Sequence, residues 1–258
     1  MTSTTAPTDA MPMGRRLLRR LPHLALILAI VAVLLLAAGP LGWRAGWWHY
    51  SIGFFYLMAW SAYCGLAAVA VAIIALVFGR RINAGRQIAI GVIAFVIGAA
   101  IAYVPWHWNN LRGAYPRVND VTTDFDNPPS LAFAEAMRKA EHGHPVAYDG
   151  AKAAPQKKSY PDIAPAMLTL PPDQAFDRAL ATAKATGWTI IQSDPETGTI
   201  DADDRSRWFG FTDDIAIRVS PAGGGSRVDI RSGARLGGGD YGVNAARVRT
   251  YLAALRGS

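Results

Sequence analysis

Three long apolar stretches in the first half of the chain constrain its fold more than any other feature. They cover residues 24–41, 54–78 and 88–106, and none of them contains a charged side chain or a histidine. Stretches of about 20 apolar residues can cross the hydrocarbon core of a bilayer as helices, which satisfy their own backbone hydrogen bonds. The sequence therefore predicts a three-helix transmembrane anchor over residues 23–108.

Arginines at the ends of these stretches predict how the anchor is oriented. Seven of them lie in the tail over residues 1–22 or between the second and third stretches, and three lie at the opposite ends: Arg15, Arg16, Arg19, Arg20, Arg80, Arg81 and Arg86 against Arg44, Arg112 and Arg117. Positive charge is enriched on the cytoplasmic side of membrane proteins. We therefore expect a bacterial inner-membrane protein with a cytoplasmic N-terminus and a C-terminal domain in the periplasm. A cleaved signal peptide is the alternative, but two further apolar stretches follow the first.

The distribution of charge argues against a nucleic-acid partner. The whole chain has a net charge of +7, but residues 1–119 carry +9 and residues 120–258 carry −2. The basic excess therefore belongs to the membrane half, and we expect the lipid bilayer, not a polyanion, as the partner of these arginines. The lack of ionisable groups in the apolar stretches also argues against a transporter. Small residues, among them Gly65 and Gly98, permit close packing of the helices.

Residues 109–165 differ in composition from the anchor that precedes them. Much of this segment is rich in proline, alanine, glycine and lysine, and it has one helical pattern, over residues 131–141. We expect an extended connector with one short helix. His142 and His144 could join His107 around a metal, but no carboxylate or cysteine is suitably spaced around them. The sequence predicts neither a metal nor another cofactor.

Residues 166–258 have the pattern of a small α+β domain. Strand patterns cover residues 166–170, 188–192, 199–205, about 211–219 and 227–231, and helical patterns follow Pro171 and Asp240. The order is β-α-β-β-β-β-α, and two helices on one face of an antiparallel sheet would bury the apolar side of each element. A glycine turn over residues 222–225 would pair Val219 with Val228 and place Arg218 opposite Asp229.

Polar residues of the last strand and last helix form the candidate binding site. The set is Arg231, Arg235, Asp240, Asn244 and Arg247. Extending the alternation of the last strand places Arg231 and Arg235 on its polar side, where they have no assigned partner. The other three residues share one flank of the helix. A glycine loop over residues 237–239 precedes the helix, and such a loop with nearby arginines can hold an anion. The alternative is a turn, a helix cap and surface ion pairs.

Residue types suited to catalysis are scarce in this domain. No histidine or cysteine occurs after Ser159, so a Ser–His–Asp set, a Cys–His set or a zinc site with those ligands cannot form there. Carboxylates are the remaining bases, and Asp213 and Asp214 are adjacent. We favour a binding function over catalysis. A carboxylate-dependent envelope hydrolase or transferase is one alternative, and an accessory subunit of a membrane complex is another.

Several motifs resemble a known bacterial family. NDVTTDFDNPP, SYPDIAP, WFGFTDDIAIRV and DIRSGARLGGGDYGVNAARVRTYL are similar to the family called domain of unknown function 1499, from Asn119 to the C-terminus. The resemblance implies a shared fold, frequent membrane tethering and no particular activity. It adds Ser232 to the candidate set, whereas Ala234 and Gly239 stand where the family pattern has serines. We expect a protein partner or an anionic envelope component to bind this site.

Overall fold

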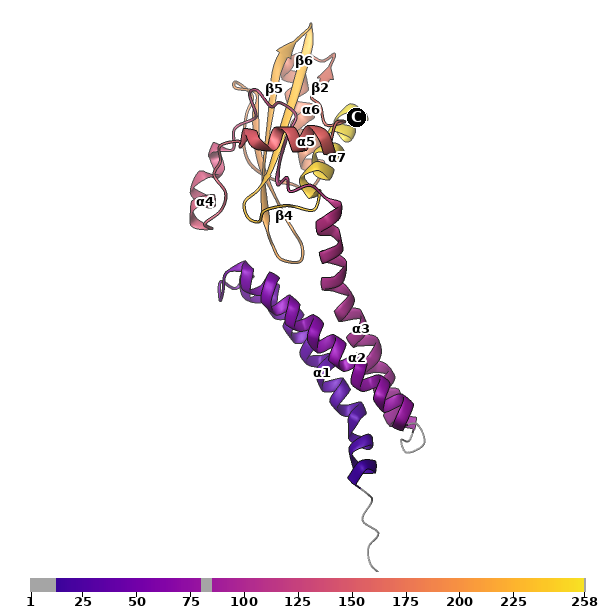
Figure 1. The fold of residues 1–258 in the computed structure, drawn as a ribbon. Helices are drawn as coiled ribbons and strands as arrows, with labels where there is room; N and C mark the ends of the chain where they lie inside the picture. The colour runs from indigo at the N-terminus through magenta and orange to yellow at the C-terminus, as the bar shows by residue number, and fades with distance from the viewer. Residues whose placement is uncertain (1–12, 80–84, 258) are drawn as a thin grey trace, which may run out of the picture. The chain divides into compact units, whose positions relative to one another are not determined.

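The computed structural model describes residues 13–79 and 85–257 (Figure 1). The chain divides into two compact units, Met1–Asn110 and Leu111–Ser258. The first 12 residues of the predicted cytoplasmic tail, and Arg80 and Arg81 of the predicted cytoplasmic loop, lie outside the described residues.

Long helices make up the described part of the first unit. They are α1 (Met13–Arg44), the π-helical turn η1 (Ile52–Leu57), α2 (Met58–Gly79) and α3 (Gly85–Ala114), whose last turn belongs to the second unit. Three helical segments are long and apolar enough to cross a membrane: Met13–Arg44, Ile52–Gly79 and Gly85–Leu111. These segments contain the three predicted stretches, so the prediction of three long apolar helices is confirmed.

Small residues bring α2 and α3 into close contact, as the sequence predicts. A Cβ atom added to Gly65 would lie 2.8 Å from the carbonyl oxygen of Gly98, and one added to Gly98 would lie 2.7 Å from that of Gly65. Ala68 and Ala72 on the same side of α2 are fully buried. In lipid, where apolar surface gives helices no reason to associate, such close backbone approach supplies the packing contacts.

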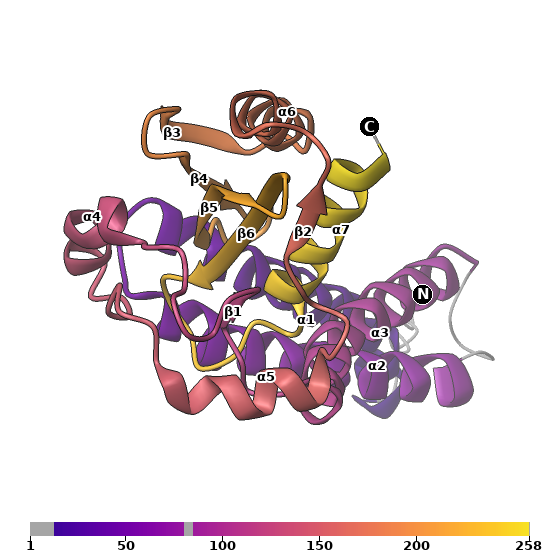
Figure 2. The same cartoon turned by 90° about the horizontal axis from the view of Figure 1, so that it is seen from above.

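The second unit is built on an antiparallel sheet with the strand order β1-β6-β5-β4-β3, to which β2 is added through β6 (Figure 2). Its strands are β1 (Asp120–Thr122), β2 (Ala166–Leu168), β3 (Thr189–Asp194), β4 (Thr199–Arg205), β5 (Thr212–Ala222) and β6 (Gly225–Ala234). Helix α6 (Pro172–Ala185) follows β2, and α7 (Val243–Gly257) follows β6. From β2 to α7 the order is β-α-β-β-β-β-α, which confirms the predicted α+β class and element order.

The pairing of β5 with β6 follows the register expected from the glycine turn. Val219 lies opposite Val228, and Arg218 lies opposite Asp229. Gly223 has a φ of 58°, in the left-handed region that glycine adopts without steric cost. Because side chains alternate along paired strands, this register puts all the branched apolar side chains of β5 and β6 on one face.

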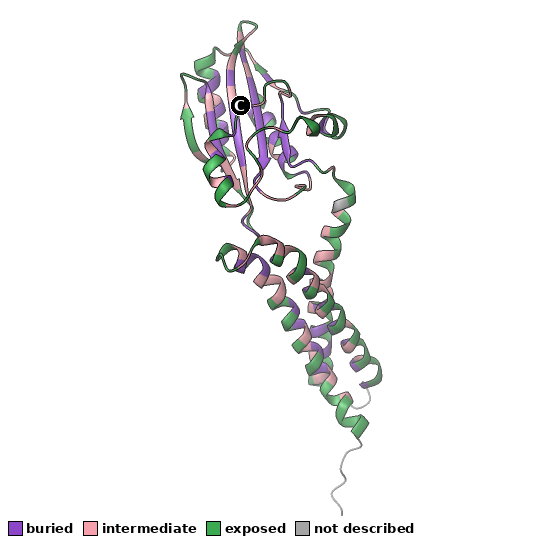
Figure 3. Cartoon of the chain, turned by 60° about the vertical axis from the view of Figure 1, so that its left-hand side comes forward, coloured by how far each residue is buried: buried purple, intermediate pink, exposed green. Residues whose placement is uncertain are grey.

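Helices α6 and α7 cover that apolar face together (Figure 2). The fully buried side chains between them and the sheet include Ile200, Ile217 and Ile230. Buried residues are concentrated on the strands in the middle of the sheet (Figure 3), whereas the edge strand β3 is mostly exposed. The hydroxyl of Tyr251 on α7 donates to the carbonyl oxygen of Ala179 on α6 at 3.1 Å. The core therefore unites both helices with the central strands.

The segment between α3 and β2 contains more packed structure than the expected extended connector. Besides β1 it forms the short helical pieces η2 (Ala132–Ala134), α4 (Glu135–Ala140), η3 (Gly150–Lys152) and α5 (Ala153–Ser159). The first two lie within the predicted helix over residues 131–141. Strand β1 and helix α5 were not expected, because a three-residue strand gives no periodic signal and α5 begins with two alanines and a proline. The Gln156 side chain of α5 forms two hydrogen bonds with the backbone of Thr122 in β1.

We predict that the connector is required for the second unit to fold. A chain that begins at Leu111 should unfold cooperatively, whereas one that begins at Ala166 should not, because it lacks Asp120 and Arg138, the buried partners of Arg231 and Asp214. Removing one partner of a buried ion pair costs about 3–5 kcal/mol, a large share of the about 5–15 kcal/mol that stabilises a typical domain. Thermal unfolding followed by circular dichroism compares the two chains. Equal, cooperative unfolding of both would contradict the prediction.

Candidate functional site

The structure divides the predicted binding residues between the two faces of the sheet. Side chains of β6 alternate, so Arg231 lies on the face opposite α6 and α7, and Ser232 lies on the helix-covered face. Arg235, just after β6, joins the side of Arg231, whereas Asn244 and Arg247 of α7 contact Ser232. The prediction of one polar cluster is therefore wrong, because the sheet separates its members.

On the sheet face opposite α6 and α7, Arg231 is paired with a carboxylate of the connector. Its Nε and Nη2 atoms donate to the two carboxylate oxygens of Asp120 at 2.9 and 2.7 Å. Its Nη1 and Nη2 atoms also donate to the carbonyl oxygens of Pro129 and Val146, and the ring of Tyr148 lies 5.3 Å away. Only 3% of the Arg231 side chain is exposed. This arginine holds the connector to the sheet and is not available to an external anion.

Asp214 of β5 is the centre of a second buried network on the same face. Its side chain has no exposed surface and accepts hydrogen bonds from Arg138 of α4 at 2.7 Å and from Arg235 at 2.7 and 2.9 Å. Arg235 also donates to Glu141 at 2.9 Å. Burial alone would lower the pKa of Arg235, but the carboxylates of Asp214 and Glu141 hold it above its ordinary value. The expectation that Arg231 and Arg235 lack partners is thus wrong. Arg231 pairs with a carboxylate of the connector, and Arg235 pairs with Asp214 of β5 and with Glu141 of the connector.

A third polar cluster lies at the end of the helix-covered face. Arg247 donates to the Ser232 hydroxyl at 3.0 Å and to the Asn244 side-chain oxygen at 2.6 Å. It also pairs with the carboxylates of Asp204 and Asp213, each at 2.8 Å. Only 7% of the Arg247 side chain is exposed. The cluster joins α7 to the ends of β4 and β5, so its direct role is to fix the last helix on the sheet.

The N-terminus of α7 is occupied by the carboxylate of Asp240, as the sequence predicts. Its two oxygens accept hydrogen bonds from the backbone N–H groups of Gly242 at 3.0 Å and Asn244 at 2.7 Å. The preceding glycine loop is also held to the connector, because the carbonyl oxygen of Gly237 accepts from the Asn119 side chain at 2.6 Å. An anion at this helix end would have to replace the capping carboxylate.

Asp213 and Asp214, the predicted alternative catalytic pair, point to opposite faces of the sheet. They are consecutive residues of β5, and their charge partners lie on different sides, Arg247 for Asp213 and Arg138 for Asp214. Burial raises the pKa of Asp213 to about 6, and Arg247 opposes this shift. The two carboxylates cannot act together on one substrate, because the sheet lies between them.

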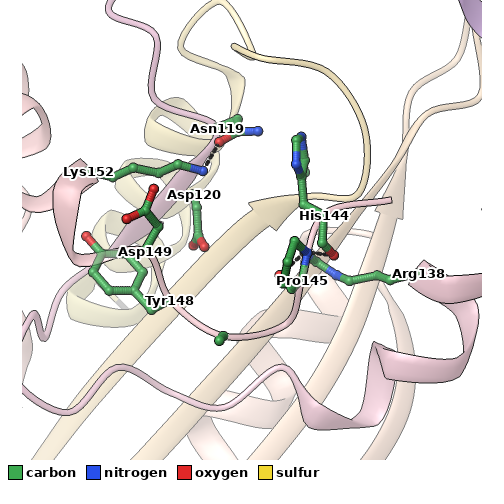
Figure 4. A pocket seen from close by; sticks show the side chains of 10 residues that line it. Asn119, Asp120, Arg138, His144, Pro145, Tyr148, Asp149 and Lys152 are labelled. Atoms are coloured by element: carbon green, nitrogen blue, oxygen red, sulfur yellow. Dashed lines mark hydrogen bonds between the residues drawn. The ribbon is translucent and has the colours of Figure 1, made fainter. Parts of the chain in front are cut away.

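A cavity of about 370 Å³ lies where the connector passes the start of β1 and the end of β6 (Figure 4). One wall carries Asn119, Asp149 and Lys152, and the facing wall carries His144 and Arg138 (Figure 4). Lys152 donates to the side-chain oxygen of Asn119, and the His144 ring is 2.8 Å from the carbonyl oxygen of Gly237. Within the part of the chain that the structure describes, no ion pair involves Lys152 or Asp149.

Sequence reasoning missed this cavity because it assigned the whole segment to an extended connector. The segment is rich in lysine, but its composition does not indicate which lysine faces a cavity. The ring of His144, considered in the sequence as a possible metal ligand, lies against the Gly237 carbonyl oxygen. Among the described residues, no group of three or more histidine, cysteine or carboxylate side chains is placed to hold a metal ion.

We predict that Asp213 makes the second unit less stable as the pH rises from about 4 to about 6. The pKa of its carboxyl is raised from 3.8 to about 6 on folding, so in this range the folded chain binds the proton more tightly than the unfolded chain. Stability then falls as the proton is lost, by up to about 3 kcal/mol for a shift of two pH units. The Asp213→Asn variant should lack this contribution, which hydrogen exchange of β5 amides at several pH values would measure in the full-length protein.

The difference between the natural chain and Asp213→Asn measures the contribution of Asp213 alone. Asp201 and Asp203 also have raised pKa values, but both residues are present in both proteins. Parallel stability curves for the natural chain and Asp213→Asn would contradict the prediction. Asp214→Asn serves as the contrast: it should destabilise the unit at every pH, because it removes the negative charge that Arg138 and Arg235 share.

Comparison with known proteins agrees with the motifs described above. The model of a family described as protein of unknown function (DUF1499) matches residues 120–255, which is more than half of the chain and nearly all of the second unit. The match begins at the first residue of β1 and includes residues 120–165 of the connector, in agreement with the contacts that bind this segment to the sheet. No curated protein matches the chain. On the evidence of this match, the chain belongs to the DUF1499 family.

Proposed function

We propose that this protein is a multi-pass inner-membrane protein that displays its DUF1499 domain outside the cytoplasm and uses it to bind an anionic envelope component. The cavity beneath the connector is the proposed binding site. The observation that carries the proposal is the placement of Lys152 on the cavity wall without a carboxylate partner among the described residues. A ligand with a carboxylate or phosphate group would supply that partner.

The environment of the cavity supports a small ligand over a large one. Its volume of about 370 Å³ is near the lower end of the range for small-molecule sites. Asp120 and Arg138 also line it, but both are held by other residues, Asp120 by Arg231 and Arg138 by Asp214. These fixed charges would orient a polar ligand without changing their own pairing, while Lys152 and Asp149 would contact it as donor and acceptor.

The positions of the other predicted binding residues support this choice of site. Arg231, Arg235 and Arg247 are each less than a tenth exposed, and each is paired with a carboxylate. An external anion would have to displace a buried carboxylate to reach any of them, which leaves that carboxylate with an unpaired charge. The three arginines therefore contribute to the proposed function by shaping the domain, and Lys152 contributes by contact.

We predict that a reporter fused after Ser258 will show an outer location for the domain. Arginines flank the cytoplasmic ends of the proposed spans in excess, and three spans place the chain's two ends on opposite sides of the membrane. Alkaline phosphatase fused there should be active, and green fluorescent protein should be dark when exported through the general secretion route. A fusion in the loop before Arg86 provides the control with the opposite expected pattern. The reverse pattern would contradict the proposed orientation.

We predict that Lys152→Met will abolish stabilisation of the domain by inorganic phosphate, used as a probe for the anionic group. A ligand at 100 times its dissociation constant stabilises a protein by about 2.7 kcal/mol, so phosphate should raise the unfolding midpoint of the natural chain by several degrees. Lys158→Met is the matched control, because Lys158 is exposed on α5 and does not line the cavity. Intrinsic tryptophan fluorescence of the detergent-solubilised chain measures the midpoint. No stabilisation, or equal stabilisation of both variants, would contradict the proposed site.

A further inference from the structure

The loop between β4 and β5 presents an aromatic and basic tip at one end of the sheet. Trp208 has an exposed fraction of 37%, and Arg205 and Arg207 beside it are exposed. Internal bonds hold the loop in shape: the Ser206 N–H donates to the carbonyl oxygen of Phe211 at 2.8 Å, and Arg205 Nε donates to that of Gly210 at 3.0 Å. The loop is therefore an ordered turn that carries an exposed tryptophan and two exposed arginines.

This tip lies at the end of the sheet where the chain enters the domain from α3. Paired residues form a row across the sheet that begins at Asp120, the first residue of β1. From β1 to β4 its members are Asp120, Gly233, Asp214 and Asp203. The β4–β5 loop begins after Arg205, two residues beyond the row in the direction away from the turn between β5 and β6. The loop thus extends past the level at which the chain enters.

The chain length between α3 and β1 limits how far the first residue of β1 can lie from the end of α3. Helix α3 ends at Ala114 and its segment Gly85–Leu111 is apolar enough to cross a membrane, whereas β1 begins at Asp120. The five residues between Ala114 and Asp120 span at most about 20 Å when fully extended. The opposite end of the sheet, at the turn around Gly223, is separated from that entry point by the full length of β5 and β6.

The chemistry of the tip fits the headgroup layer of a membrane. Tryptophan is enriched at membrane–water interfaces because its ring is apolar and its N–H is polar. Arginine side chains are attracted to anionic headgroups. Arg117, in the segment by which the chain enters, is also exposed and adds a third positive charge at this end. Asp204, the nearest carboxylate along the chain, is paired with Arg247 of α7.

We propose that this end of the sheet rests on the bilayer that α3 crosses, with Trp208 in the headgroup layer and Arg205 and Arg207 against anionic lipid headgroups. The contact limits the rotation of the domain on its short tether. It is independent of the ligand proposed for the cavity, because none of these three residues lines that cavity.

The test uses the full-length chain in nanodiscs of phosphatidylcholine with phosphatidylglycerol. A bimane fluorophore is attached at Trp208→Cys, where its apolar ring stands in place of the indole, in a Cys64→Ala background that removes the native thiol. The control label is at Ala222→Cys, at the opposite end of the β5–β6 ladder. A headgroup-labelled quencher lipid should quench position 208 several-fold more than position 222, and aqueous iodide should show the reverse order.

Two results would overturn the proposal. One is that iodide quenches both positions equally and the quencher lipid quenches neither. The other is that position 208 is shielded from iodide without being quenched by the lipid, which would indicate a protein contact instead.

The role of the arginines has its own comparison. In the labelled chain, Arg205→Gln with Arg207→Gln should reduce lipid quenching at position 208, and so should replacing the anionic lipid with phosphatidylcholine alone. Lys158→Gln with Lys184→Gln is the matched control, because it removes the same charge from exposed positions outside the loop. Quenching that depends on neither the arginines nor the anionic lipid would overturn the headgroup pairing.

Discussion

Ion pairing between the connector and the polar face of the sheet is the interaction on which the second unit depends. Asp214 has no exposed side-chain surface and lies between Arg138 and Arg235, while Arg231 is bound by both oxygens of Asp120. A buried ion pair adds little net stability, because desolvation of the two charges offsets their attraction. Loss of one partner is nevertheless costly, because it leaves the other charge buried and unpaired. The connector and the sheet must therefore be ordered together.

The same pairing decides which residues remain for a ligand. The arginines that the sequence predicts as ligand contacts are paired with buried carboxylates of the domain. The carboxylate of Asp240 occupies the N-terminus of α7. Lys152 differs in that its described contact is a neutral side-chain oxygen, that of Asn119. A neutral partner leaves the charge of the ammonium group uncompensated, and an incoming anion can pair with it without breaking an ion pair.

The sequence predicts those parts of the fold that depend on periodicity and omits those that depend on contacts between distant residues. The alternation around Val219 and Val228 correctly gave the register of the long hairpin, and the apolar stretches gave the helices of the anchor. Strand β1 has three residues, all buried, of which two are polar, so no alternation marks it. The prediction of the binding site was wrong for a related reason. Arg231 and Asp120 are 111 positions apart in the chain, and no local pattern connects them.

The cavity and the aromatic tip lie at the same end of the sheet, which links the two proposals physically. Asn119 and Asp120 line the cavity and belong to the segment by which the chain enters the domain. Ala234 of β6 also lines the cavity, and it lies opposite Asp213, one residue from the row that starts at Asp120. If Trp208 rests in the headgroup layer, the cavity opens within a short distance of that layer. An anionic group held by Lys152 would then be one that is present at, or delivered to, the membrane surface. Loss of the tip contact without loss of phosphate binding would separate the two properties, since different residues produce them.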